Sequence, residues 1–229
     1  MRMRRKRNLD ERLAAVSDYI IERTVLDKNM RTSIEQKDYV DFCKVFGNSN
    51  PVELEIGCGK GAFIVTLAKR NPNVNYLAIE MLSNVIVEAC EKAKKENLKN
   101  VRFMILRAEC LESYVPEKSI SKIYLNFSTP LPQKGYEKQR LTHAKFLNIY
   151  KRLLIGGGEI CQKTDSPFLF EFSLVQYSSC GYILKDVKLD LLRSNCENNI
   201  MTEYELKFAQ MDAPIYRIVA YLPTDEEKP

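Results

Sequence analysis

A run of nine residues combines glycines with carboxylates in a spacing that suits a nucleotide ligand. It reads Glu53-Leu54-Glu55-Ile56-Gly57-Cys58-Gly59-Lys60-Gly61. Glycines at a turn from strand to helix let the backbone approach a ligand with no Cβ in the way, and the helix that follows presents free N–H groups. We therefore expect Gly57, Gly59, Lys60 and Gly61 to border a nucleotide cofactor.

Two glutamates narrow the choice of nucleotide. With Ala62, the glycines also satisfy the G-x-G-x-x-A pattern of dinucleotide enzymes. Glu55 lies just before the glycines, where its charge would repel a pyrophosphate but can face the cationic methionine part of S-adenosylmethionine, directly or through water. Glu80, at the tip of the next expected strand, can accept hydrogen bonds from both ribose hydroxyls, as an acidic residue also does in nicotinamide enzymes. Together the two carboxylates favour S-adenosylmethionine.

Strands and helices must alternate to position these residues. Apolar runs bounded by turn residues predict strands at 52–56, 76–79, 101–106, 120–125, 159–163, 182–189 and 215–222. Helical spacing predicts helices at 62–70, 85–95, 142–154 and 168–179, with Gly156-Gly157-Gly158 stopping the third helix before its strand. The pattern predicts an α/β, Rossmann-like fold: a mostly parallel seven-stranded sheet with helices on both faces, ending in an antiparallel pair.

The first 50 residues differ in character from the rest. Residues 9–23 alternate apolar and charged side chains at helical spacing and predict a helix. We expect residues 1–50 to be a basic tail with a helical extension packed on the domain, and residues 51–229 to be the S-adenosylmethionine-dependent domain. The basic start is followed by Asn8-Leu9-Asp10-Glu11 and not by an apolar run, which argues against a signal peptide, and no later stretch is long enough to span a membrane.

The seven cysteines are odd in number and none falls in a C-x-x-C pair. This favours reduced, mostly buried thiols of a cytoplasmic protein over disulfides or zinc ligands, so no metal is expected. The net charge of +5 is modest, and basic residues concentrate in Arg2–Arg7 and again between Gln133 and Arg140. Both clusters, the second through Lys134, Lys138 and Arg140, can meet phosphates, although a solvated surface explains either cluster equally well. His143 falls at an expected helix start and is given no catalytic role.

Several longer strings occur in a fixed order along the chain. They are Met1-Arg2-Met3-Arg4, the run Glu55 to Gly61, Ile123-Tyr124-Leu125-Asn126-Phe127-Ser128, Arg140-Leu141-Thr142, Lys163-Thr164-Asp165, Asn199-Ile200-Met201-Thr202-Glu203-Tyr204-Glu205 and Pro214-Ile215-Tyr216. In these strings the chain resembles the bacterial tRNA (guanine-N7-)-methyltransferases, class I S-adenosylmethionine-dependent enzymes that modify a guanine in the variable loop of tRNA.

The resemblance implies roles for particular residues. Glu55 and Glu80 would contact the methyl donor, and the loop Asn126–Pro132 would line the guanine pocket. Asp165, Thr202, Glu203, Tyr204 and Glu205 would bind the substrate base or order the methionine end of the donor. Without the resemblance, Thr202-x-x-Glu205 is a capping box that opens a helix, and Asp165 can cap the helix after the fifth strand.

The chain also departs from the family pattern. Where the family carries Ser-Asp-Pro-Trp-Pro-Lys-Lys-Arg-His, this chain reads Ser128-Thr129-Pro130-Leu131-Pro132-Gln133-Lys134-Gly135-Tyr136. Thr129 thus stands where the aspartate commonly assigned as catalytic is expected, beside Asn126. Gln133 and Lys134 take the places of substrate-binding basic residues. A carboxylate expected near the adenine falls on Arg107, which leaves Ala108 and Glu109 as the nearest donor contacts.

The chemistry of the reaction indicates how much the replaced family residues matter. N7 of guanine carries an in-plane lone pair and no proton, so its methylation requires alignment with the donor and no general base. We therefore expect a tRNA-methylating enzyme, monomeric or homodimeric. A catalytically inert tRNA-binding relative is the main alternative. A methyltransferase for exocyclic amines and a nicotinamide oxidoreductase fit less well, because the Asn-Pro-Pro-aromatic pocket and hydride-transfer residues are not evident.

Overall fold

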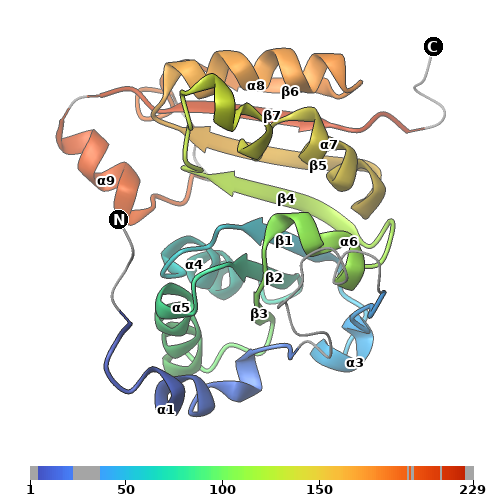
Figure 1. Ribbon diagram of the computed structural model, residues 1–229, viewed down its shortest axis with the longest axis vertical. Coiled ribbons are helices and arrows are strands. Elements are labelled where there is room, and N and C mark those ends of the chain that lie inside the picture. Colours follow the sequence, from blue (N-terminus) through green and yellow to red (C-terminus); the bar gives the residue numbers. More distant parts are fainter. Residues whose placement is uncertain (1–4, 23–36, 195, 197–198, 212, 225–229) are drawn as a thin grey trace.

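The computed structural model describes residues 5–22, 37–194, 196, 199–211 and 213–224, with the side chains of Glu203 and Lys207 outside that description. Within these residues seven strands form one sheet, in the order β3-β2-β1-β4-β5-β7-β6 (Figure 1). Strands β1 to β5 run parallel, and β7 is antiparallel to both β5 and β6. The strand bounds are β1 Val52–Ile56, β2 Asn75–Glu80, β3 Val101–Ile105, β4 Ile120–Asn126, β5 Leu154–Thr164, β6 Ile183–Lys188 and β7 Tyr216–Tyr221. The predicted fold class and the antiparallel end of the sheet are confirmed.

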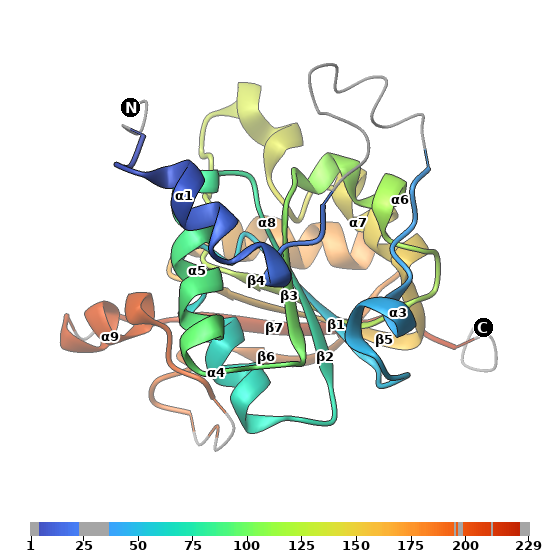
Figure 2. The same cartoon turned by 90° about the horizontal axis from the view of Figure 1, so that it is seen from below.

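Helices cover both faces of this sheet. One face carries α4 (Ala62–Arg70) and α5 (Ser83–Lys95), and the other carries α6 (Leu111–Tyr114), α7 (Ala144–Leu153) and α8 (Pro167–Ser179). Figure 2 shows α1 (Leu9–Ala14) lying against α5. Side chains of a strand alternate between faces, so Leu54 and Ile56 join the core under α6 to α8 while Glu53 and Glu55 face the α4 side. Strand β1 thus delivers a carboxylate to the α4 side directly before the glycine loop.

Two predicted boundaries are wrong, for tertiary reasons. The helix predicted for residues 9–23 ends at Ala14 and is followed by the short 3-10 helix η1 (Ser17–Tyr19). Ile20 then forms a bridge with Phe103 on the edge strand β3, and this pairing requires extended backbone. The glycines Gly156–Gly158, expected to separate helix from strand, lie inside β5, where Gly157 N–H and Gly158 C=O pair with Leu222.

Short elements complete the fold. They are α3 (Phe42–Phe46), η2 (Ala108–Cys110), η3 (Lys134–Gln139) and α9 (Glu203–Gln210). The last begins at the capping box predicted for Thr202 and Glu205, which is confirmed. His143 caps α7, its Nδ1 accepting a hydrogen bond from the Lys145 N–H at 3.0 Å. All seven cysteines are free thiols, of which Cys58, Cys90 and Cys110 are buried. No helix in the described part of the chain has both the length and the apolar character needed to cross a membrane.

Candidate active site

A cleft of about 620 Å³ opens at the carboxyl ends of the parallel strands. This edge is where ligands bind in open α/β sheets. The ends of β1 to β4, the loop after β4 and α7 supply its lining. The lining includes Ile56, Gly57, Ile79, Glu80, Met81, Leu82, Leu106, Arg107, Ala108, Glu109, Asn126, Phe127, Ser128, Thr129, Leu131, Gln139, Leu141 and Phe146. Most of the predicted donor residues therefore meet in one cavity.

The three glycines of the loop serve two different purposes. All three adopt left-handed backbone, with φ of 78° at Gly57, 56° at Gly59 and 75° at Gly61. A Cβ built on Gly57 or Gly59 meets no protein atom within 4 Å, whereas one on Gly61 would lie 2.5 Å from Cβ of Ala89. Gly57 therefore leaves open space at the cleft for a ligand. Gly61 instead allows the close packing of α5 on the loop.

Lys60 turns away from the cleft. Its ammonium lies 3.5 Å from the carboxylate of Glu88 on α5, and more than half of its side chain is exposed. Glu88 also forms an ion pair with Lys6, so the N-terminal segment and the glycine loop share one anchor on α5. In this arrangement Lys60 fixes the outside of the loop and does not line the donor cavity.

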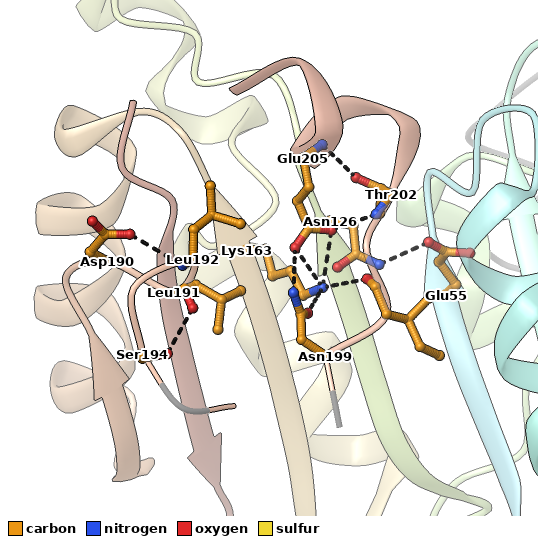
Figure 3. A network of polar contacts seen from close by, with 11 residues as sticks. Glu55, Asn126, Lys163, Asp190, Leu191, Leu192, Ser194, Asn199, Thr202 and Glu205 are labelled. Carbon is orange, nitrogen blue, oxygen red and sulfur yellow. Dashed lines mark hydrogen bonds and ion pairs between the residues drawn. The ribbon is translucent and has the colours of Figure 1, made fainter. Parts of the chain in front are cut away.

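Glu55 is a buried carboxylate that lacks one partner. It is 2% exposed, and its Oε1 accepts a hydrogen bond from Asn126 Nδ2 at 3.0 Å (Figure 3). Its Oε2 is buried and has no hydrogen-bond partner among the described residues. The pKa of Glu55 is raised to about 7, chiefly by burial and in part by nearby Glu80, while the Asn126 hydrogen bond and the Lys163 charge oppose the rise. A cation or a hydrogen-bond donor bound near Asn126 would give Oε2 of Glu55 the partner it lacks.

Glu80 marks the other end of the cleft. It lies at the tip of β2 and accepts a hydrogen bond from the Leu82 N–H at 3.0 Å, which leaves carboxylate capacity for a ligand. Met81 and Leu82 beside it are exposed apolar side chains within the lining. Glu109 is held 3.6 Å from both Arg107 and Lys145. This end therefore offers an acceptor for hydroxyl groups next to apolar surface, as a nucleoside requires.

The loop after β4 is conformationally strained. Phe127 and Leu131 have positive φ of 51° and 44° without being glycine. Such left-handed backbone costs about 1–2 kcal/mol per residue, and it persists where the surrounding structure enforces it. Between the two, the Ser128 hydroxyl is buried without a partner in the described structure, and Thr129 is exposed on the cleft. The loop thus places one exposed hydroxyl, that of Thr129, and one buried hydroxyl without a partner, that of Ser128, beside the cleft.

Arg140 holds this loop and is not available to phosphates. It is 3% exposed, and its Nε donates a hydrogen bond to the Leu131 carbonyl at 3.1 Å. Its guanidinium lies 4.6 Å and 4.4 Å from the ring centroids of Phe168 and Phe172 on α8. The expectation that Arg140 meets phosphates is therefore wrong, because helix packing has buried it. Gln133, Lys134 and Lys138 are exposed, and none of the three lines the cleft.

The segment that carries Thr202 to Glu205 is fixed by buried polar contacts. The Thr202 hydroxyl accepts from the Glu205 N–H at 3.0 Å, and the Glu205 carboxylate accepts from the Thr202 N–H at 2.7 Å. Lys163 Nζ lies 3.1 Å and 3.2 Å from the two Glu205 oxygens (Figure 3). Thr202 and Glu205 are buried, whereas the exposed Tyr204 places its ring 5.0 Å from that of Phe127 in the strained loop. Among residues 202–205, Tyr204 and the backbone beside it are thus best placed to meet a substrate. The side chain of Glu203 is not among those that the structure describes.

Asp165 follows β5 and is partly buried. The helix after it is capped by Ser166, whose hydroxyl accepts from the Leu169 N–H at 3.2 Å, so the capping role suggested for Asp165 is wrong. Asp165 does not line the donor cleft. It directly follows the carboxyl end of β5.

A second cleft, of about 580 Å³, lies on the α4 side of the sheet. It shares Asn126 with the donor cleft and extends along β1 and β4 to Glu53 and Lys122. Tyr124 donates a hydrogen bond to Glu53 at 2.8 Å, and Lys122 pairs with Glu159 at 3.0 Å. Glu53 and Lys122 are therefore already paired with groups of the protein.

Sequence reasoning missed several residues of the site. Leu141 stands in a quoted string without an assigned role, and Gln139 and Met81 carry no local pattern that points to a cleft. Lys163 reads as an ordinary strand residue next to Thr164. Only the packing of residues 199–205 against β5 shows that its ammonium is buried.

Comparisons with known proteins agree with this geometry. Residues 49–218 match a sequence profile of the family described as "Putative methyltransferase". A tRNA (guanine-N(7)-)-methyltransferase of Geobacillus sp. (strain WCH70) is 41% identical over 228 residues, covering 100% of this chain and 99% of that protein. The enzyme of that name from Listeria monocytogenes serotype 4b is 50% identical over 177 residues, 77% of this chain and 83% of that protein.

A solved structure shows the same fold at low sequence identity. It is a SAM-dependent methyltransferase from Aquifex aeolicus, superposed with a TM-score of 0.54 at 16% identity over 95% of this chain and 100% of that one. The donor cleft, the profile and the full-length relatives lead to one conclusion: the chain belongs to the tRNA (guanine-N(7)-)-methyltransferase family.

Proposed function

We propose that this protein transfers the methyl group of S-adenosylmethionine to N7 of a guanine in the variable loop of tRNA. The observation that carries the proposal is the buried Glu55 carboxylate, whose Oε2 has no partner in the described structure, directly before a glycine loop that leaves open space. A cation fits beside this carboxylate, and a pyrophosphate does not. Membership of the family supports both the donor and the nucleic acid.

The residues of the cleft fit the donor. S-adenosylmethionine supplies a methyl group on a sulfonium sulfur, which makes that methyl electrophilic. Glu55 lies behind Asn126, which lines the cleft and donates to it, and its carboxylate would face the cationic methionine part, with Gly57 leaving room for it. Glu80 would accept hydrogen bonds from the ribose hydroxyls, and Met81 and Leu82, which line the same end of the cleft, would offer apolar surface to the adenine. Ala108 and Glu109 line the cleft near the same end and offer backbone and carboxylate contacts.

The loop after β4 holds the guanine. Because N7 has a free lone pair, the residues must hold the ring in the plane that aims N7 at the methyl carbon, and no proton has to be removed first. Such alignment can contribute several kcal/mol of barrier lowering. The exposed Thr129 hydroxyl would form a hydrogen bond with the edge of the base, and the Phe127–Tyr204 ring pair lies next to it at the loop.

The direct test is to incubate the protein with labelled S-adenosylmethionine and unmodified tRNA and then map the labelled nucleotide. We expect one 7-methylguanosine in the variable loop, and no label in tRNA whose target guanine is replaced by adenine. Binding of tRNA without any methyl transfer would support an inert tRNA-binding relative instead, a reading that the replacement of the expected aspartate by Thr129 motivates.

Replacement of Thr129 by alanine should slow methyl transfer by only about 10- to 100-fold, equivalent to about 1.4–2.7 kcal/mol of positioning. The hydroxyl is exposed on the cleft and takes no proton from N7. The check is a single-turnover rate at saturating donor, measured across pH, in wild type, Thr129→Ala and Thr129→Asp. The rate of the chemical step should be nearly flat around neutral pH. A complete loss in a folded Thr129→Ala that still binds donor and tRNA would contradict this.

The rest of the chain suits an RNA-modifying enzyme of the cytoplasm. We propose that residues 1–50 form a basic tail and helical extension and that residues 51–229 form the methyltransferase domain, acting as a monomer or homodimer. The described part of the extension is anchored on the domain, since Arg12 pairs with Glu91 and the Val40 N–H donates to the Tyr114 carbonyl at 2.8 Å. Exposed Lys134 and Lys138, close to the strained loop in sequence, would contact tRNA phosphates.

A further inference from the structure

Lys163 is a buried cation with a full set of partners. It lies at the carboxyl end of β5 and is 7% exposed. Its ammonium donates to Asn199 Oδ1 at 2.6 Å, to the Ile200 carbonyl at 2.9 Å and to both oxygens of Glu205 (Figure 3). All of these acceptors belong to residues 199–205, the segment that leads into α9. Within the described structure this one side chain therefore joins the sheet to that segment at four acceptor atoms.

Among the described residues, the side-chain hydrogen bonds that join this segment to the sheet are those of Lys163. The segment's own bonds are internal: the capping box joins Thr202 to Glu205, and Asn199 Nδ2 donates to Glu205 Oε1 at 3.1 Å. Glu205 is 0% exposed, so its charge depends on Lys163 for compensation. Ile200 is buried against the core on the α4 side, yet a single apolar contact does not fix the rotation of a helix.

We propose that Lys163 is a positioning residue for methyl transfer, whose ammonium ties the start of α9 to the carboxyl end of β5 so that Tyr204 meets Phe127 at the substrate loop. Pairing of β4 with β5 places Lys163 beside Asn126, the residue that holds Glu55. One cation thus connects the donor side of the site with its substrate side. The inference rests on the proposed function and deepens it.

The pKa of Glu55 gives a second consequence of the same geometry. The groups that act on Glu55 are Asn126 from β4 and Lys163 from β5, which lower its pKa, and Glu80 from β2, which raises it; the Cys58 thiol of the glycine loop lies close to it as well. Removal of the Lys163 charge should therefore raise the pKa of Glu55 above about 7. The pH at which donor binding is half lost should then move upward.

The test uses three variants of the full chain. Lys163→Met leaves Glu205 buried without its cation, and loss of one partner of a buried pair is strongly destabilising. We expect its midpoint of thermal unfolding to fall by about 10 °C. Lys163→Met with Glu205→Gln removes both charges and keeps an acceptor for the Thr202 N–H, so most of that loss should be regained. Lys122→Met is the matched control, because Lys122 lies on the same face of the sheet and pairs with Glu159 away from the donor cleft.

Two readouts separate positioning from stability. In the double variant, hydrogen exchange of the peptide covering residues 199–210 should speed up at least about tenfold, and the single-turnover rate at saturating donor should stay about 100-fold below wild type, as for a lost positioning contact. Lys122→Met should match wild type in both. If exchange in this peptide is unchanged, or if the rate recovers together with the unfolding midpoint, the inference is overturned. Should the wild type methylate no tRNA, the proposed function fails while the exchange readout still decides the role of Lys163.

Discussion

Donor affinity should fall about tenfold for each pH unit below 7 and level off above it, because the cationic donor binds the ionised form of Glu55. Burial raises the pKa of this carboxyl from 4.5 to about 7, so below that value a proton must leave before binding. The change of affinity with pH would be measured by calorimetry, with S-adenosylmethionine and with S-adenosylhomocysteine. The second compound has the ammonium and ribose but no sulfonium. Titrations in buffers of different ionisation enthalpy should show up to one proton released per donor at pH 6.

In the ligand-free protein, ionisation of Glu55 should have the opposite effect: it favours donor binding but destabilises the fold. Between 4.5 and about 7 the folded chain holds a proton on Glu55 that the unfolded chain has lost, so the free energy of unfolding decreases as pH rises through this window. The difference in pKa corresponds to roughly 3 kcal/mol. Without donor, Glu55→Gln should therefore be more stable than wild type at pH 8. At the same pH it should bind donor about 10- to 100-fold more weakly, the worth of a charged hydrogen bond.

Glu53→Gln is the control for this experiment. Glu53 lies two residues earlier on the same face of β1, and burial raises its pKa too, but its carboxylate is held by Tyr124 in the other cleft. The variant should keep the wild-type slope of donor affinity with pH. A wild-type affinity that is flat from pH 6 to 8, or a Glu55→Gln variant with wild-type affinity and slope, would remove Glu55 from the donor site.

How much the sequence predicts depends on the range of the interactions involved. Strand β1 and helix α4 have the predicted bounds because local signals decide them: an apolar run, a glycine turn and a helical pattern. The helix predicted for residues 9–23 fails because Ile20 pairs with Phe103 across more than 80 positions of the chain, and no local pattern contains that pairing. The same holds for β5, whose glycines pair with Leu222.

The residues of the site likewise fall into a group that the sequence predicts and a group that depends on long-range packing. Glu55, Gly57, Glu80 and Asn126 lie at the ends of parallel strands, and the topology of the sheet alone brings those ends together. Side chains whose role depends on which helix packs over them were harder to predict. Arg140 looks like part of a basic surface in the sequence, yet α8 covers it. Glu205 looks like a ligand for substrate, yet Lys163, Asn199 and Thr202 use its oxygens.

Replacement of Arg140 by alanine should lower the single-turnover rate by about 100-fold or more while donor affinity changes by less than about threefold. The guanidinium lies between two rings of α8 and holds the Leu131 carbonyl, and Leu131 is one of the two left-handed residues of the substrate loop. Without this hold the loop can relax to ordinary backbone, which carries Thr129 away from the base. Donor residues on β1 and β2 do not contact Arg140, so the donor site should be spared.

Two comparisons make the Arg140 prediction specific. Glycine adopts left-handed backbone without strain. Arg140→Ala should therefore slow the reaction less in a Leu131→Gly background, measured against Leu131→Gly alone, than it does in wild type. Lys138→Ala, an exposed neighbour in η3, should instead weaken tRNA binding and reduce its salt dependence by about 0.7–0.9 in slope, one phosphate contact. Arg140 is 3% exposed, so its replacement should leave the salt slope unchanged. A flatter salt slope with a normal rate at saturating tRNA would show that Arg140 reaches a phosphate after all, and that the strained loop is held by its remaining contacts.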